Sequence, residues 1–472
     1  MTVIAEEQAA EHIHGICLKT GPPRLVGVEL EWLVRDARDP ALPVPAERIA
    51  AAVSAFGAEV PKGNAGEAVG SFPANGSSRY VLALPSSSAP GVLPSGATLT
   101  AEPGGQLELS SLPADSLADC VRSTTADLAA LRAAAADAGL ELAGVGLDPF
   151  RPPRRVLHLP RYAAMEAYFD RGGPWGRQMM CATASVQVCL DAGDDGDGPT
   201  GYRWRWRLLH AIGPVLVAAF ANSPLRDGKP TGWRSTRQQV WAHMDPGRTR
   251  PPRPKPPPDG GPAGDPRADW AAYALDAQVM CVPDRESGDW TAPPGLTMRD
   301  WLRGAAIEGR VDSQGAWDGR GDRGAAGARL RPATTADLSY HLSTLFPPVR
   351  PRGHFELRMI DAQPGDGWVV PTAVTSALLG DASAGDEAMA AAGRLVPDRP
   401  GEPWLTPWLT AARHGPAAPG LAQASRECFG AARTALARHN TPAPILAAVD
   451  AFIERYVSKD RCPADDLLEE VG

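Results

Sequence analysis

The chain has 472 residues and a formal net charge of −8 at pH 7, with 43% hydrophobic and 22% charged residues. This length is enough for one large enzyme domain or several ordinary ones. The negative charge argues against a nucleic-acid surface, which needs clustered basic residues, and the longest apolar stretch, residues 211–221, is too short to span a membrane.

The first residues contain no basic segment followed by an apolar core. The sequence therefore predicts no signal peptide and a soluble, cytoplasmic protein. Its seven cysteines include no C-x-x-C pair, and their number is odd. This pattern favours reduced thiols over a disulfide framework or a zinc site.

The chain is predicted to open with a helix over residues 5–18, followed by a strand over residues 24–34. The strand alternates strictly between apolar and other residues. Glu29 and Glu31 lie together on the side that is not apolar.

A helix over residues 46–56 and a strand near residues 79–84 come next. Residues 102–111, EPGGQLELSS, then alternate again and predict a second strand with one apolar and one polar face. Glu102 and Glu108 belong to the polar face.

The following part predicts a long alanine-rich helix over residues 114–138, a strand over 141–147 and a helix over 161–171. Residues 181–191 show period two and predict another strand. One face of that strand carries Thr183, Ser185 and Gln187.

A buried helix with a proline kink is predicted over residues 202–224. Residues 246–268 are so rich in proline and glycine that a mobile or polyproline-like loop is expected there. A helix over residues 334–346 begins at a threonine cap.

This helix leads into a strand over residues 353–361, where Glu356 and Arg358 share the polar face. The remaining chain is mostly helical, without a linker that would separate an independent domain. We therefore predict a catalytic sheet-and-helix domain over residues 1–380 and a C-terminal helical segment, residues 381–472, packed on the same domain.

Strands with a polar face recur in four separate segments, and a solvated sheet surface is one interpretation of them. Their polar faces, however, are poor in lysine and rich in glutamate. If the strands are neighbours, the carboxylates converge and repel one another unless cations hold them. Hard divalent ions with oxygen ligands suit such a site, and Mg²⁺ suits one that phosphate oxygens complete.

Arg358 points the same way as Glu356, since the period of a strand is two. A surface ion pair is one explanation for this pair. An arginine beside metal-binding carboxylates also fits a phosphoryl group held between them. The chain contains no P-loop motif, and its glycine-rich stretches lack the strand-to-helix context of a dinucleotide site. If ATP binds, metals on the sheet must hold it.

Several motifs carry a family resemblance. The segments VGVELEW, EPGGQLELSS, MMCATASVQVCLD, AAFANSP, TTADLSYHLSTLFPPVR and HFELR resemble, in order, the signature segments of glutamate–cysteine ligases of the plant and actinobacterial type. The resemblance covers residues 25 to about 370. Within the family, the chain looks most like the actinobacterial branch associated with ergothioneine biosynthesis.

The resemblance implies an α+β fold related to glutamine synthetase, with a curved, mainly antiparallel sheet forming a funnel and helices packed outside. It also implies ATP-dependent ligation of the γ-carboxylate of L-glutamate to the amino group of L-cysteine through a γ-glutamyl phosphate, with more than one Mg²⁺ ion. The polar strand faces would then line the funnel.

The resemblance also implies roles for individual residues. Arg358 and Glu356 would be catalytic, and Arg358 and Gln187 would meet the nucleotide. Substrate contacts would come from Arg237, Arg248, Thr183 and Met180. The metal-binding residues would be Glu29, Glu31, Glu102, Glu108, Glu356 and Gln187.

Three alternatives stay open at this stage. The nearest is a related ligase that joins glutamate to a different amine. A phosphate- or metal-binding protein without catalysis has no need of all these residues, and a metal-dependent hydrolase is disfavoured because no histidine stands among the acids. The expected partners are small molecules only, without nucleic acid or membrane, and the protein is expected to be a monomer or a homodimer.

Overall fold

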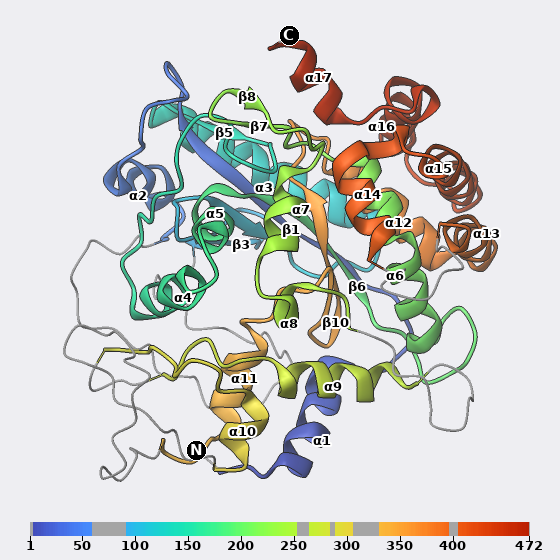
Figure 1. Ribbon diagram of the computed structural model, residues 1–472. Coiled ribbons are helices and arrows are strands. Elements are labelled where there is room, and N and C mark those ends of the chain that lie inside the picture. The colour runs from blue at the N-terminus through green and yellow to red at the C-terminus, as the bar shows by residue number, and fades with distance from the viewer. Residues whose placement is uncertain are drawn as a thin grey trace, which may run out of the picture.

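An antiparallel sheet forms the centre of the fold (Figure 1). The computed structural model describes residues 3–58, 91–252, 264–283, 288–304, 330–395 and 405–471. Within them the sheet has eight strands in the order β2-β3-β4-β1-β6-β10-β9, with β5 paired to β1, and every pairing is antiparallel. The strands are β1 Val26–Asp36, β2 Gly91–Val92, β3 Thr98–Ala101, β4 Leu107–Ser110, β5 Leu140–Ala143, β6 Ser185–Asp191, β9 Val349–Pro351 and β10 His354–Asp361, and a separate hairpin joins β7 Leu225–Arg226 to β8 Lys229–Pro230.

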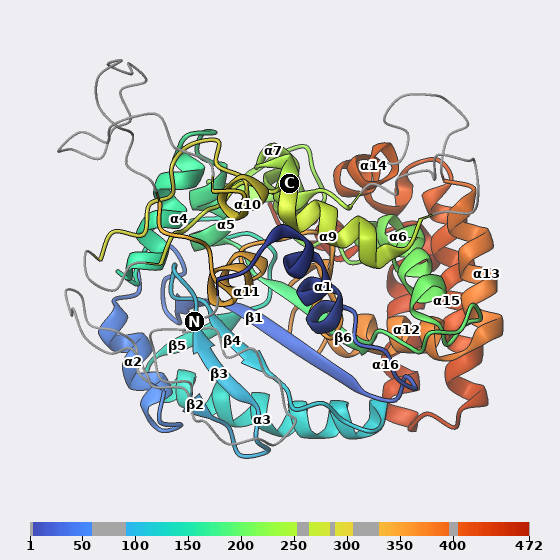
Figure 2. The same ribbon diagram turned by 90° about the horizontal axis from the view of Figure 1, so that it is seen from below.

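Helices cover the sheet on both sides. Figure 2 shows the sheet between α3 on one side and α4, α5 and α7 on the other. The helices up to residue 276 are α1 Glu6–Cys17, α2 Ala46–Ser54, α3 Leu117–Asp137, α4 Pro160–Asp170, α5 Trp175–Ala182, α6 Tyr202–Ala219, α7 Thr236–His243, α8 Pro246–Thr249 and α9 Pro266–Asp276. The later helices are α10 Met298–Leu302, α11 Thr335–Leu342, α12 Val369–Gly380, α13 Ala382–Gly393, α14 Thr406–His414, α15 Leu421–Arg438, α16 Ala443–Arg455 and α17 Pro463–Glu469.

The apolar face of the sheet packs into the main core. Leu30, Val188 and Leu357, from three neighbouring strands, are all buried there. Helices α3 and α12 contact this region, and Trp206 of α6 packs against Phe355 of β10 with ring centroids 5.6 Å apart. Burying these side chains against helices leaves the alternate residues of the same strands on the opposite face.

The predicted α+β class, with an antiparallel sheet and helices outside it, is confirmed. The first helix, the strands that carry Glu29 and Glu356, and the helix that begins at Thr334 also form as predicted. Thr334 caps α11 by accepting a hydrogen bond from the backbone N–H of Asp337. The strand predicted near residues 79–84 lies outside the described residues.

The C-terminal helices gather along α6 and α12, as the orange and red ribbons of Figure 1 show. Helix α13 contacts α6, and α15 contacts both α6 and α12. The division of the chain near residue 380 stays a prediction. Among the described helices, none combines the length and apolar character needed to cross a membrane.

The prediction of one strand over residues 102–111 is wrong in its first half. Residues 102–106 form the loop of the β3–β4 hairpin, in which the N–H of Gly105 donates to the carbonyl of Glu102 at 2.8 Å. Gly105 has φ +85°, which glycine adopts at no steric cost. The strand predicted over residues 181–191 also begins later than expected, at Ser185, because helix α5 extends to Ala182.

The expectation of a loop over residues 246–268 is wrong at both ends, where helices α8 and α9 form. Their first residues, Pro246 and Pro266, stand where a helix needs no N–H donor. The preceding Asp245 and Asp265 accept backbone N–H bonds and cap the two helices. Residues 253–263 lie outside the described residues.

The loop of the β3–β4 hairpin packs directly against the end of α5. A Cβ atom added to Gly104 would lie 2.1 Å from the carbonyl oxygen of Cys181. We expect Gly104→Ala to lower the free energy of unfolding by about 1–3 kcal/mol through overpacking, measured by chemical denaturation. Gly430→Ala is the control, because a Cβ at this site in α15 meets nothing within 4 Å. It should leave stability unchanged or raise it by up to about 1 kcal/mol, and equal effects of the two changes would contradict the proposed clash.

Candidate active site

The strand register brings the acids of the polar face together. Glu31 of β1 lies opposite Glu108 of β4, and Glu29 lies opposite Gln187 of β6. Glu356 of β10 lies one strand further along, opposite Cys189 of β6. Residues that are far apart in the sequence therefore line one face of four adjacent strands.

The carboxylates of Glu29, Glu31, Glu102 and Glu108 are half-buried beside one another, and the pKa values of three of them reflect this partial burial. Burial, followed by the charge of Glu31, raises the pKa of Glu102 to about 7. Burial and then Glu29 hold the pKa of Glu108 well above its usual range. Burial and then Glu356 raise the pKa of Glu29. When these glutamates are ionised they repel one another, and a bound cation would reduce that repulsion.

Glu102 reaches this cluster from the hairpin loop rather than from a strand. Gln106 in the same loop donates its side-chain amide to the carbonyls of Thr183 at 2.9 Å and Met180 at 3.3 Å. The loop is therefore fixed to the end of α5, and Thr183 and Met180 are both buried there. Arg161, at the start of α4, provides positive charge that lowers the pKa of Glu102 against the larger effect of its burial.

Glu356 differs from the other acids because arginines surround it. Arg350 on β9 donates from Nη2 to Oε1 at 2.8 Å and from Nε to Oε2 at 3.1 Å. Arg352 donates to Oε2 at 3.3 Å, and Arg358 donates to Oε1. Burial alone would raise the pKa of Glu356, but the three guanidinium groups hold it well below its usual range. This carboxylate therefore stays ionised.

Arg358 lies where the pairing of β10 with β6 is irregular. The register shifts between Leu357 and Ile360, as in a β-bulge. Arg358 there donates to the side-chain carbonyl of Gln187, whose amide in turn donates to Glu31 at 3.0 Å. The Nε atom of Arg358 is buried and has no hydrogen-bond partner among the described residues. Gln187 thus connects the arginine of β10 with an acid of β1.

Arg237, in the first turn of α7, is only 1% exposed. It donates from Nη2 to the carbonyl of Arg358 at 2.7 Å, and its guanidinium lies over the ring of Trp241 at 4.5 Å. Its Nε and Nη1 atoms have no hydrogen-bond partner in the described part of the chain. Buried donors without partners are rare in proteins, and a ligand carboxylate is a natural acceptor for them.

Arg248, in α8, is fully buried and bonded within the protein. Its Nη1 donates to the carbonyl and hydroxyl oxygens of Thr344 at 2.6 and 3.0 Å, its Nη2 donates to the carbonyl of Gln278, and its Nε pairs with Asp245 at 3.2 Å. Every nitrogen of this guanidinium already has a protein partner, so the geometry gives Arg248 a structural function. Its predicted contact with substrate stays a prediction.

The donor set of the polar face suits a hard cation in its chemistry. Glu29, Glu31, Glu102 and Glu108 offer carboxylate oxygens, which Mg²⁺ prefers. Burial and neighbouring acids raise the pKa of three of them, and a proton or a bound cation would neutralise their charge. Among the described residues, however, no three His, Cys, Asp or Glu side chains stand in a geometry that holds a metal ion. The acids would have to move closer together around an ion.

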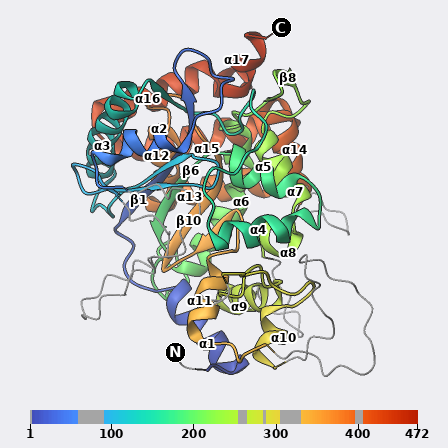
Figure 3. The same cartoon turned by 90° about the vertical axis from the view of Figure 1, so that its left-hand side faces the viewer.

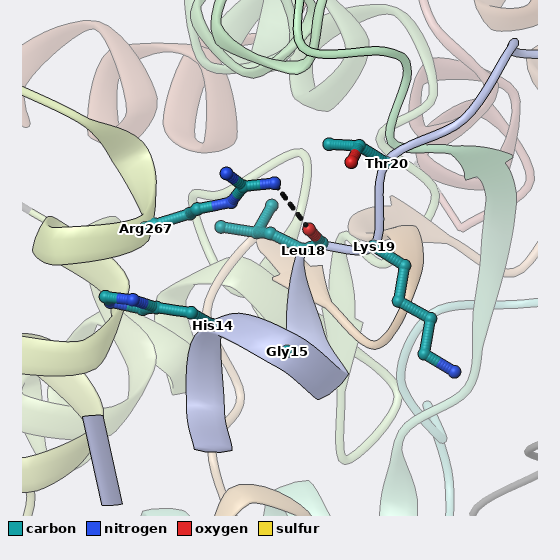
Figure 4. Close-up of a pocket in the computed structure, with 6 residues that line it drawn as sticks. All are labelled: His14, Gly15, Leu18, Lys19, Thr20 and Arg267. Carbon is teal, nitrogen blue, oxygen red and sulfur yellow. Dashed lines mark hydrogen bonds between the residues drawn. The ribbon is translucent and has the colours of Figure 1, made fainter. Parts of the chain in front are cut away.

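A hollow of about 530 Å³ lies between α1 and α9 (Figure 4), two helices that Figure 3 shows below strands β6 and β10. Arg267 projects into it and donates to the carbonyl of Leu18 at 3.3 Å. The residues that line it are His14, Gly15, Leu18, Lys19, Thr20 and Arg267. None of the predicted site residues lines this hollow.

Three arginines of the site were not identified from the sequence. Arg350 and Arg352 precede Glu356 on the neighbouring strand and its turn, and they share the even-numbered parity of Glu356 and Arg358. This alternation could have identified Arg350 and Arg352 from the sequence. Arg161 offered no such signal, because it belongs to a helix far from Glu102 in the sequence and only the tertiary fold brings its charge near that acid.

Comparisons with known proteins identify the family to which the chain is similar. The model of the glutamate–cysteine ligase family 2 (GCS2) matches residues 25–470. The chain is 40% identical over 385 residues to glutamate–cysteine ligase EgtA of Mycobacterium tuberculosis, covering 80% of this chain and 78% of that protein. It is 36% identical over 467 residues to EgtA of Mycolicibacterium smegmatis, covering 98% and 91%. Among solved structures, it is similar to glutamate–cysteine ligase from Francisella tularensis in complex with AMP, with a TM-score of 0.46, 12% identity, and coverage of 96% of this chain and 85% of that chain.

The raised pKa of Glu102 predicts how stability depends on pH. Between the ordinary glutamate pKa of about 4.3 and about 7, the folded protein keeps a proton that the unfolded chain has lost. The free energy of unfolding should therefore fall as pH rises through this range. Glu102→Gln should weaken the dependence, because glutamine does not ionise. Thermal unfolding of both proteins at a series of pH values tests this, and identical pH profiles would show that Glu102 ionises normally.

Proposed function

The chain belongs to glutamate–cysteine ligase family 2, and from this membership we infer that it is a ligase that joins L-glutamate to L-cysteine. The product is γ-glutamylcysteine, and the reaction consumes ATP. The resemblance indicated by the sequence motifs is confirmed by the family match and by two EgtA relatives. The observation that carries the assignment is the half-buried strand face on which carboxylates and Arg358 meet, in a chain of this family.

The chemistry of the reaction explains this set of residues. A carboxylate is a poor acyl donor, so the γ-carboxylate of glutamate first takes the terminal phosphoryl group of ATP and ADP leaves. The cysteine amine then attacks the acyl phosphate, loses a proton, and phosphate departs. Phosphoryl transfer depends on positioning and charge stabilisation more than on covalent help from the protein. The reaction therefore requires no nucleophilic side chain.

We propose that Glu29, Glu31, Glu102 and Glu108 hold Mg²⁺. The ions would offset the negative charge of the phosphates and of the transition state. The support is the raised pKa of Glu29, Glu102 and Glu108 on one half-buried face. Metal ligation by Glu356 and Gln187 stays a prediction, since in this structure Glu356 binds three arginines and Gln187 connects Arg358 to Glu31.

Arg358 is proposed to stabilise the phosphoryl group during transfer. Its unpaired Nε is a hydrogen-bond donor close to the acids that would hold the metal, and a guanidinium stabilises phosphoryl oxygens well. Glu356 would keep this arginine in place.

Arg237 is proposed to bind the α-carboxylate of glutamate through the donors that lack protein partners. Thr183 and Met180, beside the hairpin loop, would form part of the wall of the glutamate pocket. The preference for cysteine over another amine follows from the named relatives. The cytoplasmic location and the oligomeric state stay predictions.

The assignment predicts which components the reaction needs. ADP release should require both Mg²⁺ and glutamate, and should rise strongly when cysteine is added, because acyl phosphate formation precedes amine attack. A coupled assay with a panel of amines measures this. Turnover in EDTA, or indifference to glutamate, would contradict the assignment. A stronger response to another amine would favour a related ligase with a different acceptor.

Arg237→Lys tests the proposed glutamate contact. Lysine keeps the charge but lacks the planar fork that grips two carboxylate oxygens. Losing one charge-assisted hydrogen bond should cost about 1.5–3 kcal/mol, or roughly ten- to a hundredfold in affinity. The loss should appear mainly in the KM for glutamate, because this contact is similar before and during phosphoryl transfer.

The KM values for ATP and cysteine serve as internal controls in the same experiment. Both should change little in Arg237→Lys. If the substitution weakened ATP binding and left the KM for glutamate unchanged, Arg237 would belong to the nucleotide site.

A further inference from the structure

Asp361, the last residue of β10, is a buried acid outside the proposed metal and substrate groups. It is 1% exposed and lies at the far end of the strand from Glu356. Its Oδ2 accepts from the backbone N–H of Asn222 at 2.9 Å and from the hydroxyl of Ser223 at 2.7 Å. Its Oδ1 accepts from the hydroxyl of Ser235 at 3.0 Å. A buried carboxylate that accepts three hydrogen bonds is fixed in position.

Two of these partners determine how α7 begins. Ser235 caps α7, accepting a hydrogen bond from the N–H of Gln238 at 3.1 Å. Ser223 accepts from the backbone N–H of Arg237 at 3.1 Å while it donates to Asp361. The carboxylate of Asp361 is thus connected to the backbone of Arg237 through one hydroxyl and to the first turn of α7 through another.

The side chain of Arg237 faces the same strand. Its Nη1 lies 3.7 Å from Oδ1 of Asp361, and its Nη2 donates to the carbonyl of Arg358 at 2.7 Å. Two residues of β10 lie between Asp361, whose charge attracts this guanidinium, and Arg358, the arginine proposed to act on the phosphoryl group. One strand therefore positions both arginines.

The carboxylate of Asp361 packs closely against the backbone of Gly146. A Cβ atom on Gly146 would lie 2.5 Å from its Cγ. A longer acid at position 361 would press on the same backbone, so the position accepts aspartate and excludes glutamate.

We propose that Asp361 is a positioning residue that fixes the guanidinium of Arg237 relative to Arg358, and so controls how tightly glutamate binds with its γ-carboxylate beside the phosphoryl group. The proposal rests on the function proposed above for Arg237. In this proposal Asp361 acts on Arg237 through the hydroxyl of Ser223 and through its charge.

The test is a double-mutant cycle with Asp361→Asn and Arg237→Lys, analysed by steady-state kinetics. Asp361→Asn should raise the KM for glutamate about tenfold, with kcat and the KM values for ATP and cysteine within about twofold. Added to Arg237→Lys, it should raise the KM for glutamate by less than about twofold further, because the two residues act as one unit.

Asp127→Asn is the matched control. Asp127 in α3 is also buried and accepts backbone N–H bonds, from Ser95 and Ala97, but it is not bonded to α7. It should lower the melting temperature and leave the KM for glutamate unchanged. If Asp361→Asn does not fold, Ser235→Ala replaces it and should raise the KM for glutamate about threefold with the same selectivity.

The outcomes separate the two proposals. If Arg237→Lys leaves the KM for glutamate unchanged, the substrate role of Arg237 fails and the positioning role fails with it. If Arg237→Lys raises this KM while Asp361→Asn and Ser235→Ala do not, only the positioning role is overturned. Multiplicative effects in the double mutant would also overturn it, as would equal effects of Asp361→Asn and Asp127→Asn on glutamate.

Discussion

Several acids of like charge on one half-buried face of the sheet are the constraint on which the rest of the structure depends. Antiparallel pairing places Glu31 beside Glu108 and Glu29 beside Gln187, and the backbone register leaves them no freedom to separate. Burial strengthens the repulsion, since charges interact more strongly where water is excluded. The protein offsets part of it with arginines from neighbouring elements. At Glu29 and Glu102 these arginines do not outweigh burial and the neighbouring acids, so the pKa stays raised, and a bound cation would supply the missing positive charge.

Strand β10 holds the positive charges near these acids, because the arginines that bind Glu356 gather around it. Its regular part holds Glu356 among three arginines, and the register shift after Leu357 directs Arg358 toward Gln187. After the register shift, Asp361 accepts a hydrogen bond from Ser235 and lies 3.7 Å from Arg237 in α7. A bulge changes which face the following residues occupy. With this irregularity, one short strand carries Arg358 and contacts Arg237, the two arginines proposed to bind the phosphoryl group and the substrate.

The sequence predicted those parts of the site that follow from local periodicity. Alternation identified Glu29, Glu31, Glu108, Glu356 and Arg358, because a strand carries its polar residues with period two whatever its neighbours are. Tertiary packing decided the rest. Glu102 sits in a hairpin loop that α5 holds in place, and Arg161 reaches it from a helix distant in the sequence. Composition also misled at Pro246 and Pro266, because prolines that break a helix in its middle also begin one.

The three arginines around Glu356 differ in a way that fits a site which must release its ligands. Arg350 is 7% exposed, and its Nη1 also donates to the carbonyl of Leu345, so all its donors point into the protein. Arg358 is 12% and Arg352 21% exposed. Arg352 also lies 4.0 Å from Glu29, and Arg358 also donates to Gln187. If a nucleotide binds as proposed, these two arginines can turn toward its phosphate oxygens while Arg350 keeps Glu356 paired. The buried carboxylate then always retains a counter-charge, whose loss would be costly.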